Sequence, residues 1–210
     1  MIKSRKTTLI FTSVLTLLPC FAGILLWDKL PDKMAVNFDI QGNPNDWESK
    51  EFAVFALPLL MIAVHWFCVL LTASRKEKQN SKILELCLWL CPCISILCNT
   101  AIYCSALEIE FNAAKIISVF LGIVFIIIGN IMPKISQNKT VGFRTPWTVV
   151  DTDNWYYTHR IAGKIWVAGG IVMFVAAIAE IHIAVPLTAA IMILVPFYCS
   201  YKFHKKKTER

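Results

Sequence analysis

Two short polar runs carry the residue types in this sequence that could bind an anion or a carbonyl group. The first, GFRTPWT at residues 142–148, lies between two long apolar stretches. Its Arg144 carries a planar guanidinium that can bind a carboxylate, a phosphate or a carbonyl through paired hydrogen bonds. The second run, THR at residues 158–160, adds another arginine and His159, whose imidazole titrates near neutral pH. These residues predict either a specific site, with His159 as a switch or a structural hydrogen-bonding group, or a set of membrane anchors.

Membrane anchoring accounts for only part of this composition. Trp147 suits an interfacial aromatic belt, and Arg160 suits contact with anionic lipid headgroups. Anchoring gives no reason for Gly142 and Pro146 to occur beside them, so a structured loop is the favoured interpretation. Pro146 disfavours helical backbone in the residue before it. We therefore expect residues 144–148 to form a bend rather than a helix.

A helix is predicted to follow this loop, over residues 151–166. Asp151 and Asp153 suit its N-terminus, where a carboxylate accepts hydrogen bonds from free backbone amides. We expect the guanidinium groups of Arg144 and Arg160 to bind these two carboxylates or the carbonyls of the loop. The residues that share one face of this helix at helical spacing are Trp155, His159, Ala162 and Trp166.

Other classes of chemistry lack a clear signal. The eight cysteines lie within or at the ends of apolar stretches, and the CPC sequence at 91–93 is their closest spacing, so paired zinc ligands are missing. There is no HExxH or GxSxG motif. The alternatives left open are a lipid-modifying activity at Arg144, His159 and Arg160, and a transporter that uses His65 within the membrane. We expect no enzymatic activity, no cofactor and no metal.

The whole chain predicts an all-α integral membrane protein. Of its 210 residues, 57% are hydrophobic and 17% are charged, whereas soluble domains are roughly 45–50% apolar. About 20 apolar residues span a bilayer core, and the chain contains six such blocks, the last two divided only by Glu180. The helix of the motif loop is expected to lie in the headgroup region and to turn into the fifth block near Gly163. The six predicted transmembrane helices are residues 9–30, 52–73, 83–107, 113–132, 162–179 and 181–201.

Charge asymmetry predicts how these helices are oriented. If the N-terminus is inside, the cytoplasmic segments hold 17 of the 21 Lys and Arg residues, and the outer segments hold nine of the 14 acidic residues. Cytoplasmic loops of membrane proteins carry the excess of basic residues, so both termini are predicted to be cytoplasmic. The net charge of +7 then reflects membrane orientation and contact with lipid. It does not indicate direct binding of nucleic acid.

Residues 30–52, LPDKMAVNFDIQGNPNDWESKEF, predict a small extracellular lobe between the first two helices. AVNFDI at 35–40 alternates apolar and polar residues as a strand does, and QGNPND has the composition of a turn. Two strands are not stable alone, so the lobe is expected to lean on the membrane surface or on other outer loops. Its acidic side chains either attract a cationic ligand or reflect the scarcity of Lys and Arg outside. The residues expected to face a ligand are Asn37, Asp39, Gly42, Pro44, Asp46, Trp47 and Glu48.

These elements predict three parts of the chain. Residues 1–51 contain the first transmembrane helix and the extracellular lobe, and residues 52–112 contain the next two helices. Residues 113–210 contain the last three helices and the cytoplasmic loop at 133–161. The first apolar block is longer than the core of a signal peptide and has no cleavage signal after it, so we expect it to remain as a span.

The polar runs resemble the signature of the SdpI family of bacterial membrane proteins. The sequence GNIMPKISQNKTVGFRTPWT, followed by Trp, THR and GK, carries this resemblance, and its RTPWT core with the downstream His-Arg is a specific match. The outer segment is similar to a small domain of unknown function that often precedes the family domain, although Asn37 stands where that domain often has His. The two similarities cover residues 30–50 and about 115–205. The matching motif positions are Gly129, Asn130, Pro133, Lys134, Asn138, Gly142, Arg144, Thr145, Pro146, Trp147, Thr148, Trp155, Thr158, His159, Arg160, Gly163 and Lys164.

This resemblance implies an immunity function in the bacterial cell membrane. Members of the family protect a producing cell against a secreted, amphipathic peptide toxin that collapses the membrane potential. The best-known type also holds a small winged-helix repressor at the membrane, which frees the operon that the repressor controls. The resemblance therefore implies a peptide toxin as the outer partner and, where signalling is retained, a winged-helix repressor as the cytoplasmic partner.

Overall fold

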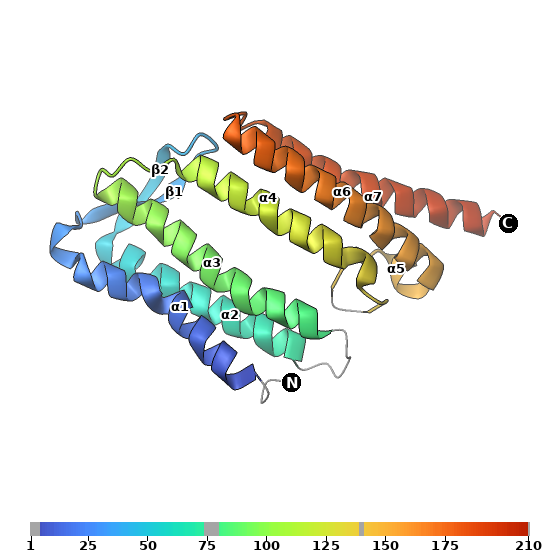
Figure 1. Cartoon of the computed structure of the whole chain (residues 1–210), viewed down its shortest axis with the longest axis horizontal. Coiled ribbons are helices and arrows are strands. Elements are labelled where there is room, and N and C mark those ends of the chain that lie inside the picture. The colour runs from blue at the N-terminus through green and yellow to red at the C-terminus, as the bar shows by residue number, and fades with distance from the viewer. Residues whose placement is uncertain (1–4, 74–79, 139–140, 210) are drawn as a thin grey trace. The chain divides into compact units, whose positions relative to one another are not determined.

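The computed structural model describes residues 5–73, 80–138 and 141–209 of the chain. Within these residues, six helices are long and apolar enough to cross a membrane, so the predicted class, a multi-pass helical membrane protein, is confirmed. The chain divides into two compact units, Met1–Ala113 and Ala114–Arg210, which run from blue to green and from green to red in Figure 1. The long helices are α1 (Lys6–Leu25), α2 (Leu57–Ala73), α3 (Asn80–Ala106), α4 (Ala113–Ile131), α6 (Thr152–Ile178) and α7 (Ala184–Thr208).

In the first unit, α1, α2 and α3 pack against one another as a bundle (Figure 1). The helix α1 ends at Leu25, earlier than predicted, and the short 3-10 helix η2 (Trp27–Lys29) follows it. The helix α2 continues from a π-helical segment, η3 (Phe52–Ala56). Hydrogen bonds between side chain and backbone tie α1 to α3: Ser95 Oγ donates to the Thr16 carbonyl and Tyr103 Oη to the Pro19 carbonyl, each at 2.8 Å.

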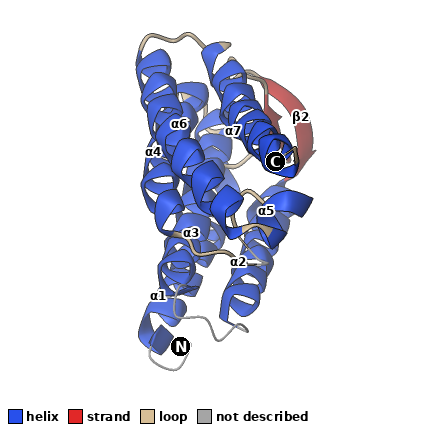
Figure 2. Cartoon of the chain, turned by 90° about the vertical axis from the view of Figure 1, so that its right-hand side faces the viewer, coloured by secondary structure: helices blue, strands red, loops and turns tan. Residues whose placement is uncertain are grey.

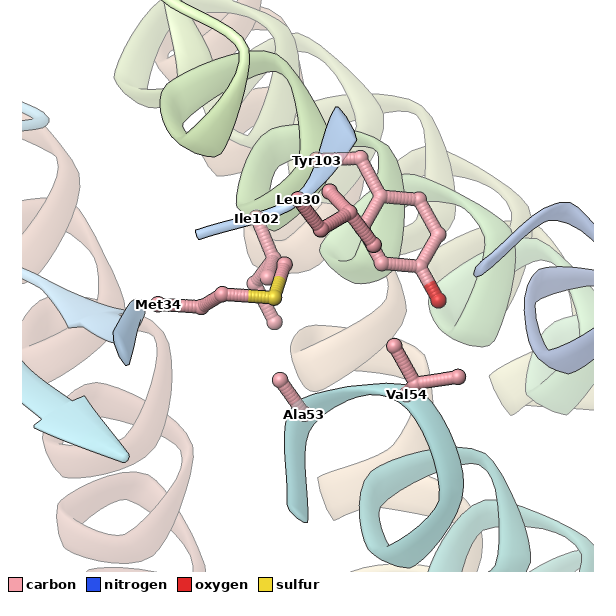
Figure 3. Close-up of a cluster of buried hydrophobic side chains, with 6 residues drawn as sticks. All are labelled: Leu30, Met34, Ala53, Val54, Ile102 and Tyr103. Atoms are coloured by element: carbon pink, nitrogen blue, oxygen red, sulfur yellow. The ribbon is translucent and has the colours of Figure 1, made fainter. Parts of the chain in front are cut away.

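The lobe is an antiparallel hairpin of β1 (Lys33–Phe38) and β2 (Pro44–Ser49). Lys33 lies opposite Ser49, and the register becomes irregular at Asn37. Met34 and Ala35 of β1 are buried, whereas all of β2 is exposed. The lobe therefore rests through one strand on the ends of helices of its own unit; the sequence had predicted support from the membrane surface or from other outer loops. The supporting cluster, drawn in Figure 3, is Leu30, Met34, Ala53, Val54, Ile102 and Tyr103.

In the second unit, α6 and α7 form an antiparallel pair that lies side by side in Figure 1. Glu180 adopts a left-handed backbone conformation, with φ of 59°, in the turn between them. Few residues other than glycine adopt this conformation, and it ends α6 sharply. The two apolar blocks divided by Glu180 are therefore separate helices, as predicted.

Glycines let α4 approach α6 closely. A Cβ atom added at Gly122 would lie 2.8 Å from the Gly170 carbonyl oxygen, and one added at Gly129 would lie 2.9 Å from the Gly163 carbonyl oxygen. Within each helix the two glycines are seven residues apart, so they share one face. Small residues allow helix backbones to meet in this way within membranes. This is a structural reason for Gly129 and Gly163 in the motif.

Two local predictions were wrong. Residues 144–148 do not form a simple bend, because Pro146 is the first residue of a short helix, α5 (Pro146–Val150). Proline suits this position, since the first amide of a helix has no partner within the helix. The predicted turn of the next helix near Gly163 is also absent from the described residues, because α6 is one continuous helix from Thr152 to Ile178.

Candidate functional site

We call residues 129–138 and 141–164, which hold the predicted motif, the motif region. Figure 2 shows α5 near the C-terminal part of α7, and α5 contacts both α6 and α7. The buried motif residues are Gly129, Thr145, Thr148, Trp155, Thr158, His159 and Gly163, and the half-buried ones are Asn138 and Trp147. The exposed ones are Asn130, Pro133, Lys134, Gly142, Arg144, Pro146, Arg160 and Lys164.

Thr145 and Thr148 cap the start of α5 reciprocally. The amide of Thr145 donates to Thr148 Oγ1 at 2.8 Å, and the amide of Thr148 donates to Thr145 Oγ1 at 3.2 Å. The Thr148 hydroxyl lies 2.9 Å from the carbonyl of Phe143, which precedes the cap. Thr145 itself is extended, with φ of −106° and ψ of 161°, as expected for a residue before proline. Thr145, Pro146 and Thr148 therefore set the direction in which the chain enters α5.

His159 joins the loop to α6. The Phe143 amide donates to His159 Nε2 at 3.1 Å, and His159 Nδ1 lies 2.8 Å from the Trp155 carbonyl oxygen. An amide is always a donor, so Nε2 must accept and Nδ1 must carry the proton that Trp155 accepts. The ring is fully buried and is neutral in this arrangement. This geometry favours a structural hydrogen-bonding role over a switch.

Gly142 makes room for this histidine. Its φ is +116°, a conformation that side chains disfavour, and an added Cβ atom would collide with His159 Nε2. The His159 ring stacks on the indole of Trp155, with centroids 4.0 Å apart. Trp155 Nε1 in turn donates to the Ile135 carbonyl at 2.9 Å. The stacked pair of Trp155 and His159 on α6 therefore holds the loop at two points, the Ile135 carbonyl and the Phe143 amide.

A second buried network links α5, α6 and α7. Trp147 Nε1 donates to Ser200 Oγ at 2.8 Å, and Ser200 Oγ donates to Asn154 Oδ1 at 2.8 Å. Asn154 Oδ1 also accepts from Thr158 Oγ1, and Asn154 Nδ2 donates to the Ser200 carbonyl at 3.1 Å. Asn154, Thr158 and Ser200 are fully buried, so each bond replaces water that these groups would otherwise require. Trp147 is consequently a packing residue of this network, with its ring stacked on His204.

The loop before α5 is held by two amide side chains. Gln137 Nε2 donates to the carbonyls of Thr148 and Val149 at 2.9 Å each, while its Oε1 accepts from Thr152 Oγ1 at 2.7 Å. Gln137 therefore bridges the end of α5 and the start of α6. Asn138 bonds within its own turn, accepting from the Val141 amide at 2.8 Å. Residues 139 and 140 lie outside the described residues.

The two carboxylates at the start of α6 bind a different cation from the one predicted. Lys207 Nζ lies 3.0 Å from Asp151 Oδ1 and 3.0 Å from Asp153 Oδ2. Arg144 and Arg160 were expected to hold these carboxylates or the carbonyls of the loop; Lys207 is a cation that pairs with both carboxylates, and both arginines are exposed. Lys207 lies far along the chain, so local sequence gave no signal for this pairing.

Asp151 also caps α6, since its Oδ1 accepts from the amides of Asp153 and Asn154 at 3.0 and 3.3 Å. Slight desolvation tends to raise the pKa of this carboxyl. The hydrogen bonds from Lys207 and from the two amides outweigh that effect and hold the pKa below its usual value. Asp151 thus remains a carboxylate at neutral pH.

The residues expected to face a ligand in the lobe have unequal roles. Asp39 organises the hairpin turn: its Oδ1 accepts from the amides of Gln41 and Asn43 at 2.9 and 2.8 Å. The backbone bond from Asn43 is the main reason that the pKa of Asp39 is lowered. Gly42 supplies the positive φ, 90°, that this turn needs. Asp39 and Gly42 are therefore turn residues first, and their carboxylate and backbone are already engaged.

The other residues of that set lie on the surface of the hairpin. Asn37 bonds locally to the Phe38 amide through Oδ1. Pro44, Asp46, Trp47 and Glu48 are exposed on β2, and the indole of Trp47 is 54% exposed. An exposed tryptophan and two carboxylates on one strand are chemically able to contact an amphipathic, cationic peptide.

Lys50 closes the base of the lobe. Its Nζ donates to the Leu30 carbonyl at 3.1 Å and to the Trp27 carbonyl at 3.4 Å, and it lies 4.9 Å from the centroid of the Trp27 ring. An ion pair with Asp32 at 3.7 Å completes this set. The lysine therefore joins the end of the hairpin to the end of α1 and η2.

Two known family profiles match separate parts of the chain. The profile of the SdpI/YfhL protein family matches residues 134–200, and that of DUF1648, a domain of unknown function, matches residues 14–62. The C-terminal part of the chain is therefore similar to the SdpI/YfhL protein family. It is 28% identical over 201 residues to "Immunity protein SdpI" of Bacillus subtilis (strain 168), an alignment that covers 94% of this chain and 96% of the relative. No solved structure matches the chain.

The SdpI match contains both hydrogen-bond networks of the motif region. It ends at Ser200, which the sequence analysis did not select although it is bonded to Asn154 and Trp147. Asn154 was missed as well, yet it lies four residues before Thr158 on one face of α6, which is a readable signal. Ser200 and Lys207 could not be found in this way, because they reach the site from another helix.

The first unit contains a row of buried polar residues, which we call the polar seam, and such residues within a membrane could serve transport. Thr12 Oγ1 lies 3.3 Å from His65 Nε2, and both residues are fully buried. Ser95 and Asn99 are buried on α3. Among the described residues this seam offers one imidazole and no buried carboxylate, which suits bonding between helices. The described residues also include no group of three or more metal-binding side chains.

Proposed function

We propose that this chain is an immunity protein that protects a bacterial cell against a secreted, membrane-active peptide toxin. The supporting observation is its similarity to an immunity protein over nearly the full length of both chains. The exposed strand β2 is the surface proposed to meet the toxin, through Asp46, Trp47 and Glu48. Successive side chains of a strand point to opposite faces, so Asp46 and Glu48 share one face of β2 and Trp47 lies on the other.

Expression in a toxin-sensitive bacterium tests this function directly. Cells that carry the protein should keep their membrane potential, measured with a voltage-sensitive dye, when the toxin secreted by the native host is added. Cells that carry a variant with Arg144→Ala serve as an expression-matched comparison. Equal depolarisation of cells with and without the wild-type protein would remove immunity as its function.

We further propose that both termini and the motif region face the cytoplasm and that the lobe faces outward. The distribution of Lys and Arg supports this orientation. Single cysteines placed in a cysteine-free background provide the test. A membrane-impermeant thiol reagent should label a cysteine at Asn45 in intact cells, and one at Asn138 only after permeabilisation. Labelling of the Asn138 position in intact cells would reverse the orientation.

The motif region is proposed to dock a winged-helix repressor. Its frame is rigid and satisfied internally, while Arg144 and Arg160 expose their side chains on it. Lysine at Arg144 keeps the charge but loses the planar, two-pronged donor. If Arg144 docks a partner, Arg144→Lys should reduce toxin-dependent recovery of a winged-helix protein in the membrane fraction nearly as much as Arg144→Ala. Full activity of the lysine variant would indicate a lipid anchor instead.

A further inference from the structure

A basic, aromatic pocket lies where the first turns of α6 meet the last turns of α7. Its lining residues are Tyr157, Lys202, Phe203, Lys206 and Lys207, and its volume is about 550 Å³. Pockets of roughly 300–1,000 Å³ accommodate small organic ligands. None of these five residues belongs to the family motif or to the lobe. We propose that this pocket binds the phosphate headgroup of an anionic phospholipid.

The charges of the pocket are only partly neutralised. Lys207 is engaged by Asp151 and Asp153. Among the described residues, Lys202 and Lys206 form no ion pair. They are four residues apart on one face of α7, an arrangement of like charges that is unfavourable unless an anion lies between them. The pocket therefore selects a ligand with negative charge.

The position of the pocket along α7 selects a lipid as the source of that charge. From Ala184 to Lys202 the helix rises about 27 Å, close to the hydrocarbon thickness of about 30 Å. Lys202 is the first charged residue of α7. The pocket therefore opens where the helix leaves the hydrocarbon core, at the depth of the lipid phosphates.

Its aromatic wall suits the region between phosphate and acyl chains. The rings of Tyr157 and Phe203 stack with centroids 4.7 Å apart and an interplanar angle of 28°. This pair offers an apolar surface beside the two lysines, and Tyr157 remains 40% exposed. Aromatic side chains favour this interfacial depth, where an apolar ring meets a polar headgroup.

Lys205 provides a matched control for this site. It is adjacent to Lys206 on α7 and carries the same charge, but it does not line the pocket and pairs with Glu209 at 3.7 Å. Attraction by net charge alone would treat Lys205 and Lys206 alike. Binding in the pocket would depend on Lys202 and Lys206 and not on Lys205.

Native mass spectrometry of the full-length protein in detergent tests the proposal, with phosphatidylglycerol as the probe. Lys202→Gln and Lys206→Gln should each weaken retention of bound phosphatidylglycerol about fivefold, the effect of one interfacial lysine, whereas Lys205→Gln should leave it within twofold of wild type. Thermal unfolding without lipid confirms that each variant is folded, and Lys206→Arg should retain binding if Lys206→Gln is unstable.

Three outcomes would overturn the lipid site. Equal losses for Lys205→Gln and Lys206→Gln would mean general electrostatic attraction. Equal retention of phosphatidylcholine would mean that the lysines do not select charge. Displacement of phosphatidylglycerol by equimolar glycerol 3-phosphate or by a soluble acidic peptide would mean that the pocket serves a free phosphate or a protein partner.

Discussion

The hairpin lobe and the motif region differ in where their polar side chains lie. The lobe rests on an apolar cluster through Met34, and its second strand is exposed throughout. The motif region buries several polar side chains and satisfies them with hydrogen bonds, and Asn154, Thr158 and His159 are fully inaccessible. In the lobe, the polar side chains of the second strand are exposed. In the motif region, hydrogen bonds between buried polar groups hold the loop, α5, α6 and α7 together.

This difference separates residues that are bonded within a frame from residues that are exposed on it. Several motif residues, including Thr145, Thr148 and His159, form hydrogen bonds within the motif region. The arginines Arg144 and Arg160 are exposed on that frame. In the lobe, Asp39 holds the hairpin turn, whereas Asp46 accepts from the amide of the next residue, Trp47, and both Asp46 and Glu48 are exposed on β2. Substitutions in the two regions should therefore differ in whether they reduce stability or function.

The largest difference in stability is expected between alanine substitutions at two glycines that both have positive φ. Gly142→Ala adds backbone strain and also a collision that breaks the bond between His159 and the Phe143 amide, so it should cost about 3 kcal/mol or more. Gly42→Ala, in the hairpin turn, should cost about 1 kcal/mol from strain alone. Thermal unfolding in detergent measures both. Equal costs would show that the motif region is no more tightly constrained than the turn.

The buried network should show coupling between α6 and α7. Asn154→Ala and Ser200→Ala should each destabilise the protein by about 1–3 kcal/mol, because each leaves buried polar groups without partners. The double variant should cost less than the sum of the two, with a coupling of about 1 kcal/mol. Additive costs in the same unfolding assay would mean that the two residues act independently.

In the lobe, charge should affect protection with little effect on folding. Asp46→Asn with Glu48→Gln should change stability by less than about 0.5 kcal/mol, since both side chains are exposed. Protection of the membrane potential should fall, and more at low salt than at high salt, because exposed charges are screened within about 10 Å at 0.1 M. Asp39 is kept, so that the turn is intact. A loss of protection that does not depend on salt would exclude electrostatic attraction.

The smallest loss of stability is expected from removing the ion pair at the start of α6. Asp151→Asn keeps a good helix cap but removes the charge that pairs with Lys207, at a cost under about 1 kcal/mol near pH 7. The pKa of Asp151 is lowered in the folded protein. Its contribution is therefore complete above the unfolded pKa of about 3.9 and is lost as pH falls through the lower folded value. The stability difference between variant and wild type, measured from pH 7 to pH 3, should shrink towards the acid end.

Several features were predictable from the sequence because they depend on neighbours along the chain. The six apolar blocks, the hairpin around QGNPND and the Asp151 cap follow from block length, turn composition and local hydrogen bonding. The error at Pro146 was also local: proline was interpreted as preventing a helix, although it starts one here. The extended backbone of Thr145 was predicted correctly, but the helix that begins after it was not.

The partners of the polar side chains were decided only by tertiary structure. Nothing near Asp151 in the sequence selects Lys207 over Arg144, because the choice depends on where α7 ends relative to α6. In the same way, Ser200 lies within an apolar stretch and becomes a network residue only when α7 packs beside Asn154. The residue types alone determined which polar groups need a hydrogen-bond partner when they are buried. The packing of the helices determined which groups satisfy them, since a hydrogen bond requires its two atoms to lie within about 3 Å.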